Sequence, residues 1–187
     1  MTTFVNFGSS DQFYIIYYMK RIAFLLFCVA LFQAGFAQSY EVVTDNQGKY
    51  YKGIISGELI ESDTAMKWWA ANKSSYTPNA AAVAGIKAQA DSIRFMVFMG
   101  TWCEDSHFVI PRFFSLLQAA GYPATNVSMI GTDRNKKAPG NLTETFSVKN
   151  VPTIIVLKNG RELGRVVEYG SSGLYDKDLS LILQGTK

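Results

Sequence analysis

An apolar stretch near the middle of the chain, followed at once by a long helical pattern, constrains the fold most. Residues 93–100 are apolar except for the second, which is typical of a strand that is buried on both faces of a sheet. The helical pattern then extends from Cys103 to about Ala120, with Pro111 inside it and Gly121 just beyond its end. This succession predicts the opening of a strand–helix–strand unit with parallel strands.

The remainder of the second half continues the alternation. Residues 127–131 and 151–157 are predicted to be buried strands, and Asn159-Gly160 is a strong hairpin signal before a returning strand at 162–168. A closing helix is expected at 174–183. We therefore predict an α/β fold with a mixed central sheet and helices on both faces.

The other expected elements rest on local start and turn signals. Residues 40–44 and 50–55 resemble two short strands joined by a turn. Three helix starts follow from capping patterns: Ser62 for a helix through Lys73, Thr77-Pro78 for a helix to about Asp91, and Asn141 with Glu144 for a short helix to Phe146.

Length and composition bound the class of protein. The chain has 187 residues, which suffice for one domain with a sizeable core, and it is 48% hydrophobic and 18% charged. This profile excludes an intrinsically disordered chain. The formal net charge is +3, which is too weak to indicate a nucleic-acid partner.

The N-terminal region carries the pattern of a secretory signal. Lys20-Arg21 precedes an apolar run from Ile22 to Phe32, and small residues follow at Gly35 and Ala37, so cleavage after Ala37 is expected. Residues 1–18 have no place in such a signal, and we interpret Met19 as the start of translation. The alternative is an uncleaved membrane anchor, although the apolar run is short for a span. Cleavage would give an exported, periplasmic or cell-envelope protein without an integral membrane span.

Cys103 is the candidate nucleophile. The chain has two cysteines, and signal cleavage removes Cys28, so the mature chain would hold a single thiol. Backbone N–H groups and the helix dipole at the start of a helix favour the thiolate, which is the reactive form of cysteine. Ser106 lies in the first turn, where we expect its hydroxyl to reach the sulfur.

These residues resemble the thioredoxin family. Trp102-Cys103-Glu104-Asp105-Ser106 is similar to its Trp-Cys-x-x-Cys motif with the second cysteine replaced by Ser106, and Pro111 matches a family proline. Val151-Pro152-Thr153 resembles the cis-proline segment, which in the family lies beside the cysteine and pairs with a bound peptide. The resemblance covers residues 93–183 and is greatest to exported single-domain members with a Trp-Cys-x-Asp-Ser site. It implies a thioredoxin fold at 93–187, preceded by an N-terminal extension at 38–92 and by the signal region at 1–37.

The chain departs from the family pattern at three points. Ser106 cannot resolve a mixed disulfide. Val97 stands six residues before Cys103, where the family often has a buried acid that accepts a proton. Glu104 and Asp105 replace the usual Gly-Pro, and their charges oppose a neighbouring thiolate.

Other polar residues near the motif have weaker indications. His107 and Asp105 are candidates for proton transfer, although a lone histidine here is more often a surface residue. The spacing of Cys103, Asp105 and His107 fans them around a helix, so we expect no metal and no other cofactor. A basic loop containing Arg134, Lys136 and Lys137 is expected to be solvated rather than to bind an acidic ligand.

The sequence therefore favours a monothiol thioredoxin-like protein. The resemblance implies thiol–disulfide exchange or isomerisation through a mixed disulfide at Cys103, with Ser106 supporting the thiolate and with Trp102, Val151 and Pro152 holding the partner. The expected partners are protein thiols or disulfides and a small-molecule thiol. The alternative is a redox-inactive peptide-binding or chaperone-like module on the same fold.

Signal cleavage is directly testable. We expect N-terminal sequencing of the exported protein to begin at Gln38, because the small residues at Gly35 and Ala37 suit a signal peptidase. A mature protein that retains Lys20 and Cys28 would instead establish the membrane anchor.

Overall fold

The structure, a computed structural model of the 187-residue chain, describes residues 14, 16–24 and 39–185. Its contacts divide the chain into two units, residues 1–38 and residues 39–187. In the first unit residues 16–24 are helical, whereas Cys28 and the expected cleavage site after Ala37 lie outside the described residues. Within the described part of the chain, no helix combines the length and apolar character needed to cross a membrane.

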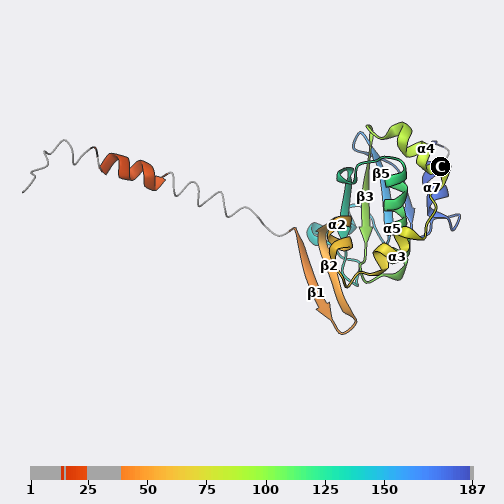
Figure 1. Ribbon diagram of the computed structural model, residues 1–187, viewed down its shortest axis with the longest axis horizontal. Coiled ribbons are helices and arrows are strands. Elements are labelled where there is room, and N and C mark those ends of the chain that lie inside the picture. Colours follow the sequence, from red (N-terminus) through yellow and green to blue (C-terminus); the bar gives the residue numbers. More distant parts are fainter. Residues whose placement is uncertain (1–13, 15, 25–38, 186–187) are drawn as a thin grey trace, which may run out of the picture. The chain divides into compact units, whose positions relative to one another are not determined.

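A six-stranded mixed sheet organises the second unit (Figure 1). The strand order is β1-β2-β4-β3-β5-β6, and only β3 and β4 are parallel neighbours. The strands are β1 (Tyr40–Asp45), β2 (Gly48–Ile55), β3 (Ile93–Met99), β4 (Val127–Gly131), β5 (Thr153–Lys158) and β6 (Arg161–Val167). The predicted α/β fold with a mixed sheet is therefore confirmed.

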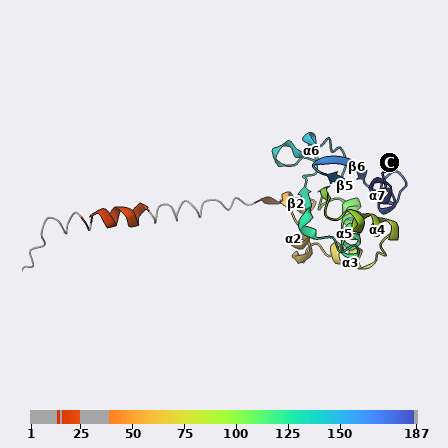
Figure 2. The same cartoon turned by 90° about the horizontal axis from the view of Figure 1, so that it is seen from above.

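Helices cover both faces of this sheet. The helices are α2 (Gly57–Ser62), α3 (Trp68–Ser74), α4 (Ala80–Gln89), α5 (Glu104–Ala119), α6 (Leu142–Thr145) and α7 (Tyr175–Leu183), with short 3-10 turns at Ala124–Asn126 and Pro139–Asn141. Seen from above, α6 lies on one side of the sheet and α5 on the other (Figure 2). The predicted helices on both faces are thus present.

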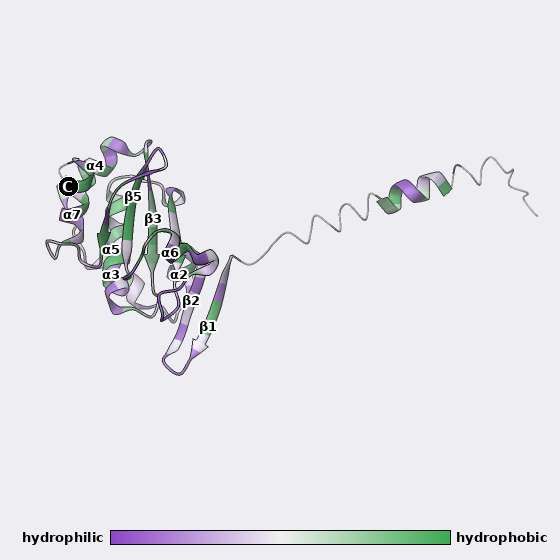
Figure 3. Ribbon diagram, turned by 180° about the vertical axis from the view of Figure 1, so that it is seen from behind, coloured by the Kyte–Doolittle hydropathy of each residue, from purple (hydrophilic) through white to green (hydrophobic). Residues whose placement is uncertain are grey.

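Alternation of side chains along β3 supplies both cores. Phe95, Val97 and Met99 point toward α5 and belong to the larger core, whereas Phe98 belongs to the smaller core on the other face. All four side chains are buried, and Figure 3 shows the hydrophobic character of this strand. A strand buried on both faces explains why its sequence is an apolar run.

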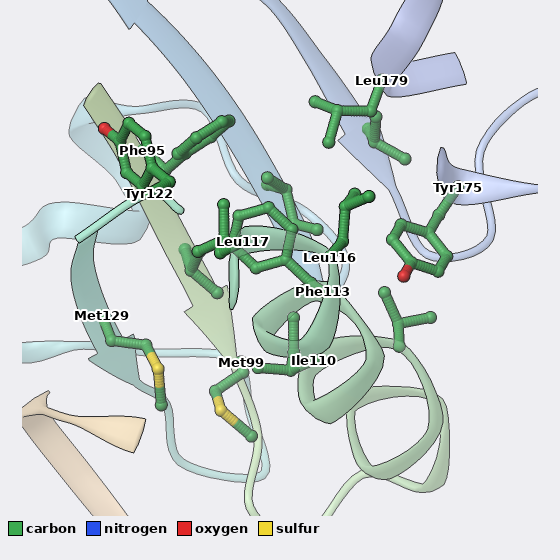
Figure 4. Close-up of a cluster of buried hydrophobic side chains, with 14 of the residues drawn as sticks. Phe95, Met99, Ile110, Phe113, Leu116, Leu117, Tyr122, Met129, Tyr175 and Leu179 are labelled. Carbon is green, nitrogen blue, oxygen red and sulfur yellow. The ribbon is translucent and has the colours of Figure 1, made fainter. Parts of the chain in front are cut away.

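Aromatic packing anchors α5 on the sheet. The Phe95 ring lies 5.1 Å from the Phe113 ring and 5.2 Å from the Tyr122 ring, both edge to face. Figure 4 shows these rings together with Leu116 and Leu117 of the same helix. Because this helix is fixed along its length, its first turn at Cys103 has a defined place above the sheet.

The segment expected as an N-terminal extension supplies two strands and three helices to the same compact unit. Strand β2 pairs antiparallel with β4, and β1 forms the sheet edge beyond it. Helix α3 packs against α5, and α4 packs against α7.

Two predicted helix starts are wrong, and a third is right in position but not in its capping mechanism. Ser62 is the last residue of α2, which is capped by Ser56 through the Leu59 N–H, and the helix in the range predicted to run from Ser62 to Lys73 is α3, which begins at Trp68. Helix α4 is capped by Asn79 rather than by Thr77. Asn141 has a positive φ of 53° and makes no side-chain cap, so the expected capping box at α6 does not form.

The corrected cap of α4 gives a stability prediction. The Asn79 side chain accepts the Ala82 N–H at 3.0 Å, and loss of such a cap costs about 1 kcal/mol. We expect Asn79→Ala to lower the free energy of unfolding in urea by that amount. Thr77→Ala, the matched control, should change it by less than about 0.5 kcal/mol; the reverse order of effects would restore Thr77 as the cap.

Candidate active site

The turn between β3 and α5 presents Cys103. The residue is the N-cap of α5, with an extended backbone, and its side chain is half-buried. Its N–H donates to the Gly100 carbonyl at 3.0 Å, and its own carbonyl accepts the His107 N–H at 3.0 Å. Cys103 therefore lies at the start of the helix, as expected from the sequence, although its side chain makes no hydrogen bond to the N–H groups of the first turn.

A loop far along the chain meets this thiol. The Cys103 Sγ donates a hydrogen bond of 3.4 Å to the carbonyl of Val151, and the Val151–Pro152 peptide bond is cis, as the resemblance implied. Both side chains of this loop are buried, and Val151 packs in the smaller core with which Trp102 and Cys103 are in contact. The structure thus brings together Trp102, Cys103, Val151 and Pro152, four of the residues selected from the sequence.

Trp102 has a fixed place beside the cysteine. Its indole Nε1 donates to the Thr132 carbonyl at 2.9 Å, just beyond the end of β4. A Cβ atom on Gly100 would lie 2.6 Å from the same indole, so the close approach of the ring requires glycine there. The tryptophan therefore closes one side of the site.

Ser106 occupies a different place from the one expected. Its side chain is fully buried, and its hydroxyl accepts the Gly100 N–H at 3.2 Å. Among the hydrogen bonds of the described residues, none joins this hydroxyl to the Cys103 sulfur. Ser106 therefore holds the turn that carries the cysteine.

His107 faces away from the thiol and toward α3. Its imidazole stacks on Trp68, with ring centroids 4.0 Å apart and planes inclined by 14°. Its Nε2 donates to the Thr101 carbonyl at 2.9 Å. Burial lowers the pKa of His107 below its usual value of 6.5. The residue is part of the α3–α5 packing rather than the surface histidine that was favoured from the sequence.

Asp105 has a partner that the sequence did not indicate. Its Oδ1 accepts a hydrogen bond of 2.9 Å from the hydroxyl of Tyr169, which follows β6. Burial raises the pKa of Tyr169, and the bond to Asp105 raises it further. No local pattern predicts this contact, because the two residues are 64 positions apart. The one signal in the sequence is that Tyr169 directly follows a predicted strand.

The basic loop is engaged by the protein itself. The Arg134 guanidinium binds both carboxylate oxygens of Asp45. Lys136 donates to Asn150 at 3.1 Å, and Lys137 pairs with Glu144. Because these three side chains already bind other residues of the chain, they do not form a free binding site for an acidic ligand.

Neither a metal site nor a second reactive centre emerges elsewhere in residues 39–185. The described residues contain no group of three His, Cys, Asp or Glu side chains placed to hold a metal ion. A cavity of about 480 Å³ lies between α2, α5 and the start of β4, with Trp69, Phe114 and Leu117 in its wall. Its lining includes neither Cys103 nor His107; the candidate nucleophile Cys103 follows the carboxyl end of β3.

Comparisons with known proteins agree with this geometry. A family model described as Thioredoxin matches residues 56–172, more than half of the chain. A thioredoxin of Chlamydia pneumoniae is 35% identical over 81 residues, which cover 43% of this chain and 69% of that protein.

Solved structures with a similar backbone also occur. A Pseudomonas aeruginosa protein of unknown function has a TM-score of 0.48 at 15% identity and covers 68% of this chain and 90% of that one. Thioredoxin-2 of a malaria parasite has a TM-score of 0.38 at 25% identity and covers 50% of this chain and 82% of that one.

The buried histidine gives a pH prediction. His107 is the only histidine, and its pKa is lower in the folded chain than in the unfolded chain. The unfolded state therefore binds the proton more readily, so the free energy of unfolding should fall as the pH drops below about 6.5, by at most about 1.4 kcal/mol per pH unit. Urea titrations from pH 7.5 to 5.5 measure this slope.

The matched variant is His107→Gln, which keeps an N–H donor for the Thr101 carbonyl but does not titrate. Its slope over the same range should be shallower than that of the wild type. Equal slopes would show that His107 does not have the depressed pKa that its burial implies.

Proposed function

The chain belongs to the thioredoxin family, and we propose that it carries out thiol–disulfide exchange or isomerisation through a mixed disulfide at Cys103. The observation that carries this proposal is the contact between the Cys103 thiol and the carbonyl of Val151, at the cis-proline loop. This contact places a nucleophilic sulfur beside the backbone that a partner peptide would use.

The proposed first step is attack of the Cys103 thiolate on one sulfur of a partner disulfide. A bond forms between Cys103 Sγ and that sulfur, the partner S–S bond breaks, and the second partner sulfur leaves as a thiolate with the bonding electron pair. Ionisation of Cys103 removes the proton that the Val151 carbonyl accepts in the resting state, so that carbonyl becomes available to a peptide N–H.

The second step needs a thiol from outside this domain. Ser106 stands where the family has its resolving cysteine, and the hydroxyl of a serine cannot attack a disulfide under these conditions. A thiolate of the substrate itself, or of a small molecule, attacks the partner sulfur and releases the Cys103 thiolate. When the attacking thiolate belongs to the substrate, the net result is disulfide isomerisation without net oxidation.

The surroundings of Cys103 suggest how the partner is held. Trp102, fixed by its bond to the Thr132 carbonyl, forms one wall of the proposed peptide site. Pro152 forms another, and its carbonyl accepts the Glu168 N–H at 2.7 Å. We assign Ser106 a positioning role, because its hydroxyl supports the Gly100 turn.

We further propose that this chemistry takes place outside the cytoplasm, in the periplasm or cell envelope. The support is the sequence of Lys20-Arg21, the apolar run and the small residues at Gly35 and Ala37. Disulfides persist in such oxidising compartments, so substrates for exchange or isomerisation are present there.

Two substitutions test the catalytic proposal. Cys103→Ala should abolish disulfide exchange with a model protein disulfide in the presence of dithiothreitol. Ser106→Cys should increase its reduction about tenfold or more, equivalent to about 1.4 kcal/mol of activation free energy, because two cysteines in one helical turn can form the resolving disulfide. Protein turbidity or thiol release measures both rates.

Ser106→Ala is the matched control, since it removes the hydroxyl without adding a thiol, and it should not accelerate reduction. If Ser106→Cys forms its disulfide but gains no turnover, the redox-inactive peptide-binding module becomes the better explanation. If folded wild-type Cys103 also resists alkylation, the exchange proposal fails outright.

A further inference from the structure

A strip of side chains leads away from the thiol along α5. Asp105, Phe108 and Arg112 have the spacing of neighbours on one helix face. Phe108 is 40% exposed, although it is a large apolar residue in a well-packed helix. An exposed aromatic residue close to a reactive group is a candidate contact for a partner.

The strip is continuous with the cis-proline loop. The Pro152 carbonyl accepts the N–H of Glu168, the residue before Tyr169. The Tyr169 hydroxyl binds Asp105 at 2.9 Å, and its ring lies 5.5 Å from the ring of Phe108. Tyr169 thus lies between the site at Cys103 and the distal part of the strip.

Arg112 ends the strip with an unused donor group. Its guanidinium carbon lies 3.2 Å from the centre of the Phe108 ring. Its Nε is buried without a hydrogen-bond partner, and no hydrogen bond or ion pair joins the guanidinium to another of the residues described here. Arg112 as a whole is half-buried, so the donors offered to a partner are the terminal amino groups rather than this buried Nε, and a guanidinium matches a carboxylate in two parallel hydrogen bonds.

Two carboxylates, one on α5 and one on α7, are engaged by tyrosine hydroxyls. Asp105 accepts the Tyr169 hydroxyl, and Asp176 accepts the Tyr76 hydroxyl at 2.6 Å. Neither is an ion-pair partner of Arg112 in the described part of the chain. Beside the larger effects of burial and of Asp105, charge on Cys103 raises the pKa of Tyr169 and the charge of Arg112 lowers it.

We propose that Arg112, stacked on Phe108, binds a carboxylate of the disulfide partner and so makes the site selective for acidic substrates. The inference rests on the proposed exchange function and names the substrate class of the same site. Phe108 provides the apolar platform for the arm of an aspartate or glutamate, and Arg112 provides the donors.

Helix geometry limits the position of that carboxylate. Cys103 and Arg112 are nine positions apart, a rise of about 14 Å along the helix. Side chains on a helix lean toward its N-terminus, which shortens the gap. An extended peptide advances about 3.3 Å per residue, so the acidic residue belongs roughly two to four positions from the attacked cysteine.

Synthetic peptides with one cysteine activated as a 2-pyridyl disulfide test this selectivity. Cys103 attacks the peptide sulfur, and 2-thiopyridone leaves and is measured by its absorbance. Each peptide carries glutamate, glutamine or lysine two, three or four positions before or after the cysteine. Glutathione and cysteamine, each activated as the same 2-pyridyl disulfide, are run in parallel as small molecules with and without carboxylates. We expect the best glutamate peptide to react about tenfold faster than its lysine counterpart at low salt.

Arg112→Gln should bring the ratio of the glutamate-peptide rate to the lysine-peptide rate close to one, and Arg112→Lys should retain part of the preference. The control is Arg161→Gln, which makes the same charge change at an exposed position at the start of β6 and should keep the full preference. Equal rates for the three wild-type peptides, or a preference that survives Arg112→Gln, would overturn the inference. If the glutathione probe reacts faster than the cysteamine probe but the peptides react at equal rates, the partner is a small-molecule disulfide and the proposal of a peptide substrate is overturned.

A binding measurement separates this inference from the exchange proposal. Cys103→Ala cannot form a mixed disulfide, yet it should bind the unactivated glutamate peptide more tightly than the glutamine peptide in a calorimetric titration. If wild-type Cys103 reacts with no probe but this difference in affinity is found, the exchange function fails and the acidic subsite stands. No difference in affinity would refute the subsite.

Discussion

Antiparallel pairing of β3 with β5 is the constraint on which the site depends. Its register places Phe98 opposite Thr153, so the end of β3 and the start of β5 lie at the same edge of the sheet. The next residues on each side are the Gly100–Cys103 turn and the Val151–Pro152 loop. The hydrogen bond from the Cys103 thiol to the Val151 carbonyl therefore follows from the sheet, and the two buried cores hold that sheet in place.

A single thiol in this setting changes the reaction that the fold can support. The turn around Cys103 is well supported, by the Ser106 hydroxyl below it and by the Trp102 indole bound at the end of β4. Position 106 holds a serine, so the site lacks a second sulfur. In the proposed exchange, the mixed disulfide persists until a thiol from elsewhere attacks it, so the surface that positions a partner matters more than in a dithiol protein. The proposed strip from Tyr169 to Arg112 would enlarge that surface.

The sequence was most informative where local patterns and burial act together. The apolar run of β3, the helix that follows it and the β5–β6 hairpin were predicted within a few residues, because continuous burial leaves little ambiguity. The starts of α3 and α4 were mispredicted and α2 was not predicted, since several polar residues in this segment are capable of capping and tertiary packing selects among them. The contacts Asp105–Tyr169 and His107–Trp68 join elements that are distant in the chain, so no local pattern reveals them.

The central claim is that Cys103 forms a mixed disulfide with a partner in the compartment where the protein acts. The most direct measurement is acid quenching of intact cells, blocking of free thiols, and mass spectrometry of the chain isolated without reductant. The account predicts peptides disulfide-linked to Cys103 that disappear in the Cys103→Ala protein and on reduction. Recovery of Cys103 solely as the blocked free thiol, from cells that contain oxidised substrate proteins, would contradict it.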